Sequence, residues 1–222
     1  MDCQARSRSF ARVSLVAGAA LLALAGSAHA AAGDIVVRGR VLELSPANES
    51  YGPHAALANN AVSVSDRLVW EVDASYFITN HIAAEIIATT PPKHTVYTNG
   101  VRLGTLRHLP PTLTFQYHIA PTNASVRPYI GVGVNFTHFS AVDLDAGPAL
   151  GSSSAVPLKV KSNSWGTAFQ LGADFPINDR LSVNVDFKKI DISTKVSLAD
   201  GTYLGTVKVN PVLFGAGIGY KF

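Results

Sequence analysis

The sequence has almost no cysteine. Its single cysteine, Cys3, lies near the N-terminus, and residues 31–222 contain none. This long segment therefore cannot form a disulfide and cannot use a thiolate as a nucleophile or a metal ligand. Long apolar runs are missing as well, because no stretch reaches the roughly 18–20 consecutive apolar residues that a membrane-spanning helix needs.

The most apolar stretch, VSLVAGAALLALAG at residues 13–26, has the features of a secretory signal peptide. It follows three arginines and precedes SAHA, in which Ala28 and Ala30 have the small-residue spacing of a cleavage site. We expect residues 1–30 to be cleaved on export. An uncleaved anchoring helix is the alternative, and the short apolar core followed at once by a cleavage signal argues against it.

Charged residues are few, at 15% of the sequence, and the basic excess is small. The whole chain has a formal net charge of +3. Three of its arginines and one aspartate precede residue 31, which leaves a net charge near +1 on the remainder. Binding to nucleic acid needs a clustered basic excess. We therefore expect no nucleic-acid partner.

Alternation of apolar and polar residues dominates the sequence after residue 30, and no segment there shows a helical period. Successive side chains of a strand point to opposite faces, so a period of two predicts strands. In the C-terminal sequence NPVLFGAGIGYKF, for example, every second residue from Val212 to Phe222 is apolar. Eight segments show the pattern: residues 34–44, 68–77, 82–90, 112–119, 129–136, 164–175, 181–189 and 212–222.

The connections between these segments alternate in length. Three are short, whereas the other four are long and rich in Ser, Pro, Asn and Gly: residues 45–67, 91–107, 140–163 and 193–206. Short turns at one end and long loops at the other are typical of an outer-membrane barrel. In lipid an open sheet edge is not viable, so the last strand must pair with the first. We predict an all-β fold for residues 31–222: an eight-stranded antiparallel up-and-down transmembrane β-barrel.

Two soluble folds remain as alternatives, a lipocalin-type barrel and a β-sandwich, in which the apolar face would point inward. The charges in the middle of several strands favour the transmembrane barrel, because they all fall on one face and suit a narrow lumen. The C-terminal Phe222 fits the same interpretation. We expect it to lie near the periplasmic boundary of the outer membrane, where aromatic rings are favoured, and to be recognised by the outer-membrane barrel assembly machinery.

Several segments also resemble the OmpW/AlkL family of outer-membrane proteins. They are AEIIATTPPKHTV, LRHLPPTLTFQYHI, RPYIGVGVNFTHF, SWGTAFQLGADFPIN and GAGIGYKF, and the match runs in order from about Arg38 to Phe222. The resemblance implies a narrow, hydrophobically lined passage for the uptake of small hydrophobic molecules, with lateral exit through the barrel wall. Ile87 matches an apolar position of the family, whereas Lys188 stands where the family tends to have an aromatic or apolar residue.

The inward face predicts two groups of site residues. A charge network should fill the lumen, because charges in a narrow low-dielectric space must be paired. Its expected members are Arg38, Arg40, Glu71, Asp73, Glu85, Asp174, Asp186 and Lys188. The two arginines should meet Glu71 and Asp73 on the neighbouring strand, as a structural plug or, alternatively, as a functional gate. Apolar lining is expected from Leu42, Leu44, Phe77 and Ile87.

The pair Pro110–Pro111 opens the fourth strand. Proline cannot donate to a β-ladder, so it marks a strand end or a bulge. A wall that lacks hydrogen bonds there could open sideways, and we regard this pair as a candidate lateral opening. A stiff junction between loop and strand is the alternative interpretation.

Catalysis is not expected. His138, Ser140 and Asp143 lie close in sequence, but no orienting group or oxyanion donor accompanies them. The histidines lack metal-ligand spacing, and GAGIG precedes no helix that could receive a phosphate. We therefore predict no enzymatic activity, no metal and no cofactor. The preferred function is passive passage of hydrophobic solutes to the bilayer, and the alternative is a non-transporting barrel that acts as an adhesin, phage receptor or wall stabiliser.

Overall fold

The computed structural model describes residues 30–53 and 60–222. The expected signal peptide, residues 1–30, lies outside the described residues apart from Ala30. No helix in the described part is long and apolar enough to cross a membrane.

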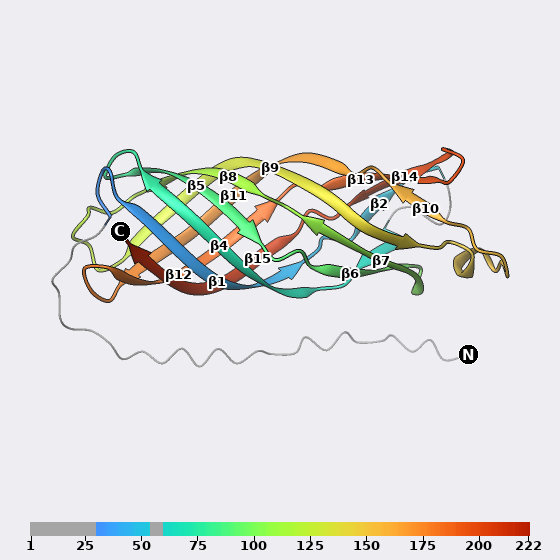
Figure 1. Ribbon diagram of the computed structural model, residues 1–222, viewed down its shortest axis with the longest axis horizontal. Helices are drawn as coiled ribbons and strands as arrows, with labels where there is room; N and C mark the ends of the chain where they lie inside the picture. The colour runs from blue at the N-terminus through green and yellow to red at the C-terminus, as the bar shows by residue number, and fades with distance from the viewer. Residues whose placement is uncertain (1–29, 54–59) are drawn as a thin grey trace, which may run out of the picture.

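Eight antiparallel strands form a closed barrel, which confirms the predicted fold class (Figure 1). The eighth strand, β15, pairs with β1 from Val36↔Lys221 to Ser45↔Val212, so the C-terminal strand is hydrogen-bonded along its whole length. In order around the barrel the strands are β1 (Ile35–Ser45), β4 (Arg67–Phe77), β5 (Ile82–Thr89), β8 (Thr112–His118), β9 (Arg127–Leu144), β11 (Asn163–Pro176), β12 (Leu181–Ile190) and β15 (Val212–Lys221).

The two faces of each strand have opposite chemistry, in the predicted orientation. Apolar side chains point outward, as Phe115 and Phe169 do with 52% and 54% of their surface exposed. Charged side chains point inward, as Asp73 and Asp186 do with 1% exposed. A soluble barrel or sandwich would have the reverse arrangement, so both alternatives are excluded. The outer apolar band is what a lipid environment requires.

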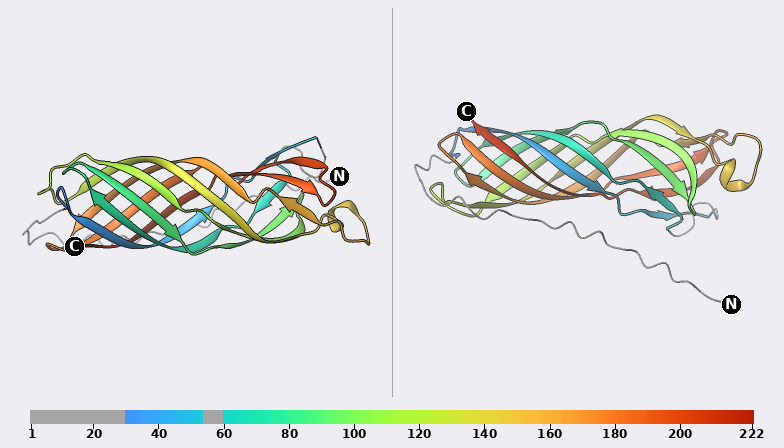
Figure 2. Two further views of the ribbon diagram at one scale, coloured as in Figure 1. Left: turned by 45° about the horizontal axis from the view of Figure 1, so that its top comes forward. Right: turned by 90° about the horizontal axis from the view of Figure 1, so that it is seen from below.

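The long connections are not structureless, which corrects the expectation from their composition. Most of their length continues the barrel strands away from the end that holds the C-terminus (Figures 1 and 2). One part, β3, β6 and β7, extends the barrel sheet beyond the far half of β9, and the other part forms a separate sheet of β10, β13, β14 and β2. We call these two parts the added sheets. The added strands are β2 (Glu49–Tyr51), β3 (Val62–Val64), β6 (Lys93–Thr98), β7 (Val101–Leu109), β10 (Leu158–Val160), β13 (Ser193–Leu198) and β14 (Tyr203–Lys208).

Short interruptions of the strands explain why the sequence pattern does not indicate them. Bulges shift the register of β7 on both edges, and Gly104 adopts a φ of +143° there. An added Cβ at Gly104 would collide with the carbonyl oxygen of Asp143 on β9. The alternation of apolar and polar residues is therefore broken where the strands bend, and prolines and glycines at the bends give the segment the composition of a loop.

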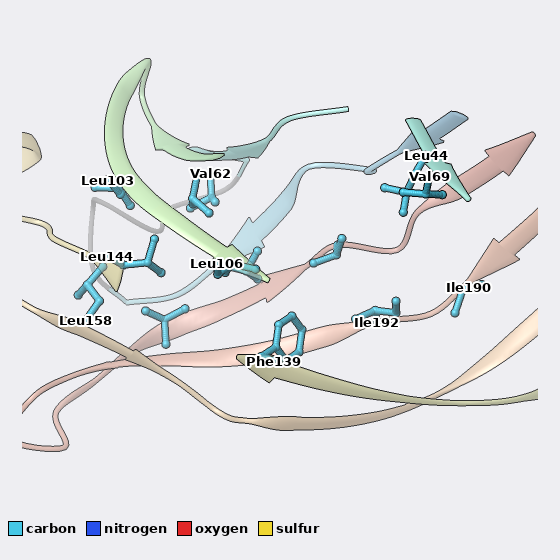
Figure 3. Packing of buried hydrophobic residues seen from close by; sticks show 14 of the residues in the cluster. Leu44, Val62, Val69, Leu103, Leu106, Phe139, Leu144, Leu158, Ile190 and Ile192 are labelled. Atoms are coloured by element: carbon cyan, nitrogen blue, oxygen red, sulfur yellow. The ribbon is translucent and has the colours of Figure 1, made fainter. Parts of the chain in front are cut away.

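The two added sheets pack their apolar faces together. Their buried side chains form one cluster with the upper end of the barrel, where Leu44 and Val69 lie (Figure 3). Leu103 and Leu106 of β7 extend this cluster toward Leu158 on the opposite sheet. The two added sheets thus form an apolar region at the end of the barrel opposite to the C-terminus, next to a lumen filled with polar side chains. We call this region, made of the two added sheets, the apolar head.

Candidate functional site

Arg38 on β1 reaches across the lumen to the far wall. Its Nε and Nη2 donate to the two carboxylate oxygens of Asp174 at 3.0 and 2.9 Å, a paired geometry that suits the planar guanidinium. Its Nη1 donates to Asp73 at 3.2 Å and to the hydroxyl of Ser75 at 2.7 Å. Four of the five N–H groups of this buried arginine are thereby directed at β4 and β11.

Arg40, two residues further along β1, occupies the next layer. Its Nη1 lies 2.6 Å from Glu71 Oε1 and 2.7 Å from Asp73 Oδ2. Its Nε donates to Asn184 at 2.6 Å, and its Nη2 lies 3.4 Å from Glu85. The structure therefore brings both arginines onto the two neighbouring carboxylates that the strand pairing placed opposite them.

Lys188 on β12 completes the charged layer. Its Nζ contacts Asp186 and lies 2.7 Å from Glu71 Oε1. The lysine therefore caps the network on the side that faces the apolar head. Among the described residues the network comprises three cations, Arg38, Arg40 and Lys188, and five carboxylates, Glu71, Asp73, Glu85, Asp174 and Asp186. We refer to these eight residues as the lumen network.

Neutral polar side chains close the space around the lumen network. The hydroxyl of Tyr129 donates to Asp186 at 2.7 Å, and Gln170 Nε2 donates to the same oxygen at 2.8 Å. Sequence reasoning did not select Tyr129, although its position in phase with the inward glycines of β9 was the available signal. Its ring fits because Gly172 faces it, and an added Cβ there would collide with the ring. An interior this full leaves no open aqueous channel.

The predicted apolar lining divides between the two ends of the barrel. Leu42 and Leu44 join the cluster of the apolar head. Phe77 lies at the opposite end, where it packs with Ala83 and where the guanidinium of Arg127 lies 5.5 Å from its ring centroid. Ile87 is buried at 3% exposure on the inward face of β5. The four residues therefore all point inward, but they do not line one continuous passage.

A cavity lies between the two sheets of the apolar head. The centre of a water-sized sphere can occupy about 40 Å³ of it, and the total space between its walls, part of it open to solvent, is about 540 Å³. Apart from Thr194 and two histidines, the described lining is apolar, with Leu106, Phe139 and Val207 among its members. We call this space the external cavity. Its apolar character is what a hydrophobic solute would need.

The two lining histidines, His94 on β6 and His108 on β7, were not predicted as site residues. Their rings are stacked, with centroids 5.0 Å apart and an interplanar angle of 11°. Both rings are buried, and the Nε2 atoms of both have no hydrogen-bond partner among the residues that the structure describes. The alternation in HTVYT and LGTLRHL could have identified them, had these segments been recognised as strands.

The wall of the barrel is interrupted beside this pair. The pairing of β5 with β8 stops at Ile87↔Thr112, and pairing resumes between β6 and β7 at Lys93↔Arg107. The segments 88–92 and 108–111 face each other across the interruption, which we call the wall gap. Each contains two consecutive prolines, Pro91–Pro92 and Pro110–Pro111. The predicted lateral opening at Pro110 and Pro111 is thus one edge of the wall gap.

Trp70 and Trp165 mark the edge of the outer apolar band that is nearer to the apolar head. His94 and His108 lie beyond this edge, on the side of the head. Burial lowers the pKa of His108 to about 3, and the neighbouring His94 acts in the same direction. Burial also lowers the pKa of His94, with a further contribution from Arg67, whereas the carbonyl of Ser65 and the charge of Asp66 oppose the shift. Both imidazoles are therefore neutral at physiological pH.

The stability of the β6–β7 hairpin should decrease as the pH falls. A folded pKa below the ordinary value of about 6.5 means that the opened hairpin binds more protons, so acid favours opening between about pH 6.5 and 3. We expect the protection factors of β6 and β7 amides in hydrogen exchange to fall through this window. The barrel strands β8 and β12 provide the internal reference.

The variant His108→Phe tests the cause of that pH dependence. It retains an aromatic ring next to His94 but removes one titrating group, so the slope of protection against pH should become shallower. His138→Phe is the matched control, because His138 is exposed on the outer face of β9. An unchanged slope in His108→Phe would show that another group is responsible.

The candidate catalytic residues do not form a site. His138 contacts Asn163 at 2.8 Å, and in the described part of the chain no hydrogen bond joins it to Ser140 or Asp143. No group of three or more potential metal ligands occurs among the described residues. This arrangement offers nothing that would activate a nucleophile.

Comparison with known proteins yields consistent matches. The sequence profile described as the OmpW family matches residues 31–222. Outer membrane protein W of Escherichia coli is 31% identical over 216 residues, covering 95% of this chain and 99% of that protein. Outer membrane protein W of Vibrio cholerae is 30% identical over 218 residues, covering 93% and 98%.

Solved structures agree. The crystal structure of outer membrane protein OprG from Pseudomonas aeruginosa superimposes with a TM-score of 0.74 at 30% identity, covering 88% of this chain and 99% of OprG. The solid-state NMR structure of outer membrane protein AlkL in lipid bilayers gives a TM-score of 0.66 at 22% identity, covering 91% and 96%. The latter likeness concerns the fold alone.

Proposed function

Because the chain belongs to the OmpW family of outer-membrane proteins, we propose that it provides passive passage for small hydrophobic molecules from the cell exterior into the outer-membrane bilayer. A solute enters the external cavity, is stopped by the lumen network below it, and leaves sideways through the wall gap. The protein acts as a barrel in the outer membrane and not as an enzyme.

The observation that carries this proposal is the order in which the apolar cavity and the charged lumen follow each other along the barrel axis. An apolar cavity lies next to a lumen filled with ion pairs, on the side of the apolar head. Moving an apolar solute through the lumen network would separate buried charges from their partners, which costs several kcal/mol for each pair broken, roughly 3–5. The cavity is therefore a favourable stopping place, and a continuous axial path is not.

The wall gap supports sideways exit. Four prolines lie on its two edges, and proline has no backbone N–H to donate. Four backbone donors are therefore missing along the two edges, so separating them breaks few hydrogen bonds. The gap begins at the edge of the apolar band marked by Trp70, since Thr90 N donates to the carbonyl oxygen of that tryptophan. A solute leaving here meets acyl chains.

Export and assembly complete the proposed pathway. We infer that residues 1–30 are removed as a signal peptide and that residues 31–222 are the barrel domain. Phe222 is 73% exposed and its ring lies edge-on to Tyr220, with centroids 4.8 Å apart. This accessible terminal aromatic, on a strand paired along its whole length, is the feature that the barrel assembly machinery would recognise.

A non-transporting receptor or adhesin barrel is the alternative function. It would need a filled lumen, which is present, but it gives no reason for an apolar cavity in the head. Uptake into lipid vesicles separates the two functions. We expect vesicles containing the protein to acquire an apolar fluorescent solute such as naphthalene faster than protein-free vesicles, with no increase in ion conductance. Equal uptake rates in both preparations would count against transport.

A further inference from the structure

The external cavity contains one polar feature that an apolar solute does not use. His94 Nδ1 lies 2.8 Å from the carbonyl oxygen of Ser65. A carbonyl oxygen can only accept, so Nδ1 carries the hydrogen and Nε2 carries a bare lone pair. That Nε2 is buried and has no partner among the described residues.

An unsatisfied acceptor of this kind is costly. A buried polar atom without a hydrogen bond destabilises the fold, and native structures rarely contain one without a reason. His108 cannot relieve it by stacking alone, although its own Nε2 is likewise buried and unpartnered. The two histidine residues line the same cavity, next to Leu106 and Phe139. A ligand in the cavity can therefore supply the missing donor.

The surroundings decide which donor fits. Among the described lining residues there is no Lys, Arg, Asp or Glu, so neither a carboxylate nor an ammonium group would find a counter-charge. A neutral imidazole lone pair repels an anion and needs an O–H or N–H group. The pKa of His94 is lowered by burial, which keeps the ring in this neutral form. A hydroxyl group is the simplest neutral donor that an otherwise apolar molecule can carry.

We propose that the external cavity binds apolar molecules that carry one hydroxyl group, such as medium-chain alcohols and phenols, with His94 Nε2 accepting the hydrogen bond from that hydroxyl. The apolar body of the ligand packs against the two sheets of the head. His108 Nε2 provides a second polar contact for the same oxygen. The inference rests on the proposed function, because it assigns a chemical class to the solutes of that pathway.

The test compares 2-naphthol with naphthalene, which differ by one hydroxyl group. The full chain is placed in lipid nanodiscs, without detergent that could occupy the cavity, and binding is followed by ligand fluorescence against empty nanodiscs. We expect 2-naphthol to bind more tightly than naphthalene. With ¹⁵N-labelled histidine, 2-naphthol should move the His94 Nε2 resonance to lower frequency as the lone pair accepts a hydrogen bond, whereas naphthalene should not.

The variant His94→Phe removes the acceptor and keeps an aromatic ring. It should weaken 2-naphthol binding by up to about tenfold and leave naphthalene binding nearly unchanged, as expected for the loss of one hydrogen bond. His138→Phe, which makes the same change on the outer face of β9, should bind both ligands as the wild type does. If His94→Phe does not fold, the resonance shift in the wild-type protein decides the question.

The outcomes separate this inference from the proposed function. Equal binding of both ligands, without a shift of the His94 resonance, would overturn the hydroxyl preference but leave hydrophobic passage intact. Failure of both ligands to bind would overturn both. Binding of 2-naphthol that shifts only His118, the buried histidine at the other end of the barrel, would place the ligand elsewhere and also overturn the inference.

Discussion

Replacing Arg40 with methionine is expected to lower the free energy of unfolding by about 3–5 kcal/mol, the usual cost of removing one partner from a buried ion pair. Methionine fills a similar volume but leaves Glu71 and Asp73 without the cation that lies 2.6 and 2.7 Å from them. The lumen network already holds more carboxylates than cations, so the loss increases an existing imbalance. Denaturant unfolding in lipid vesicles, followed by tryptophan fluorescence, measures the change.

The matched control is Arg180→Met in a short turn at the end that holds the C-terminus. Arg180 is exposed and donates to the hydroxyl of Tyr220 at 2.9 Å. Removing it should change stability by no more than about 0.5 kcal/mol, as is usual for surface positions. A similar loss in both variants would mean that the lumen network is not held together by charge pairing. Retained hydrophobic uptake in folded Arg40→Met would support a plug, whereas new ion conductance would indicate a gate.

Bridging the wall gap is expected to reduce hydrophobic uptake to the rate of protein-free vesicles. Ala88 and Leu109 lie on opposite edges of the gap and both point outward. Residues 31–222 contain no cysteine, so Ala88→Cys together with Leu109→Cys introduces the only thiols of this segment. A short bifunctional linker that reacts with both thiols would hold the edges together. Reductive release of the linker should restore uptake.

A second cysteine pair controls for cross-linking itself. Phe115 and Val132 are direct partners on β8 and β9, where the ladder is continuous, and both are exposed on the outer face. Linking cysteines at these positions should leave uptake unchanged. If the bridge at residues 88 and 109 also leaves uptake unchanged, the solute does not leave through the wall gap.

The barrel could be predicted from the sequence because each strand contacts two different environments. Lipid outside and a polar lumen inside impose opposite demands on alternate residues, so the inward phase of residues such as Arg38 and Glu85 could be read directly. The pairing of neighbouring strands also followed from the order of the chain, which predicted that Arg38 and Arg40 meet Glu71 and Asp73 on the next strand. Period and connectivity are local properties, and they needed no coordinates.

Contacts across the lumen could not be predicted in the same way. Lys188 and Glu71 are 117 residues apart on strands that are not neighbours, and their pairing depends on the diameter and stagger of the closed barrel. The histidine pair was missed for a different reason. The bulges and prolines that bend β6 and β7 also interrupt the alternation of apolar and polar residues, so these segments have the composition of loops. Without predicted strands there, no partner could be assigned to His94 and His108.

The continuity of β9 makes the head asymmetric. This strand runs for 18 residues, from Arg127 to Leu144, through the barrel and on into the sheet that carries β7 (Figure 1). In the opposite sheet of the head, β13 and β14 do not continue barrel strands in this way, since short breaks separate them from β12 and β15. One wall of the external cavity is thus continuous with the barrel through β9, whereas the other is joined to the barrel across these breaks. We therefore expect the amides of β13 and β14 to exchange hydrogen faster than those of β9 between Thr137 and Leu144.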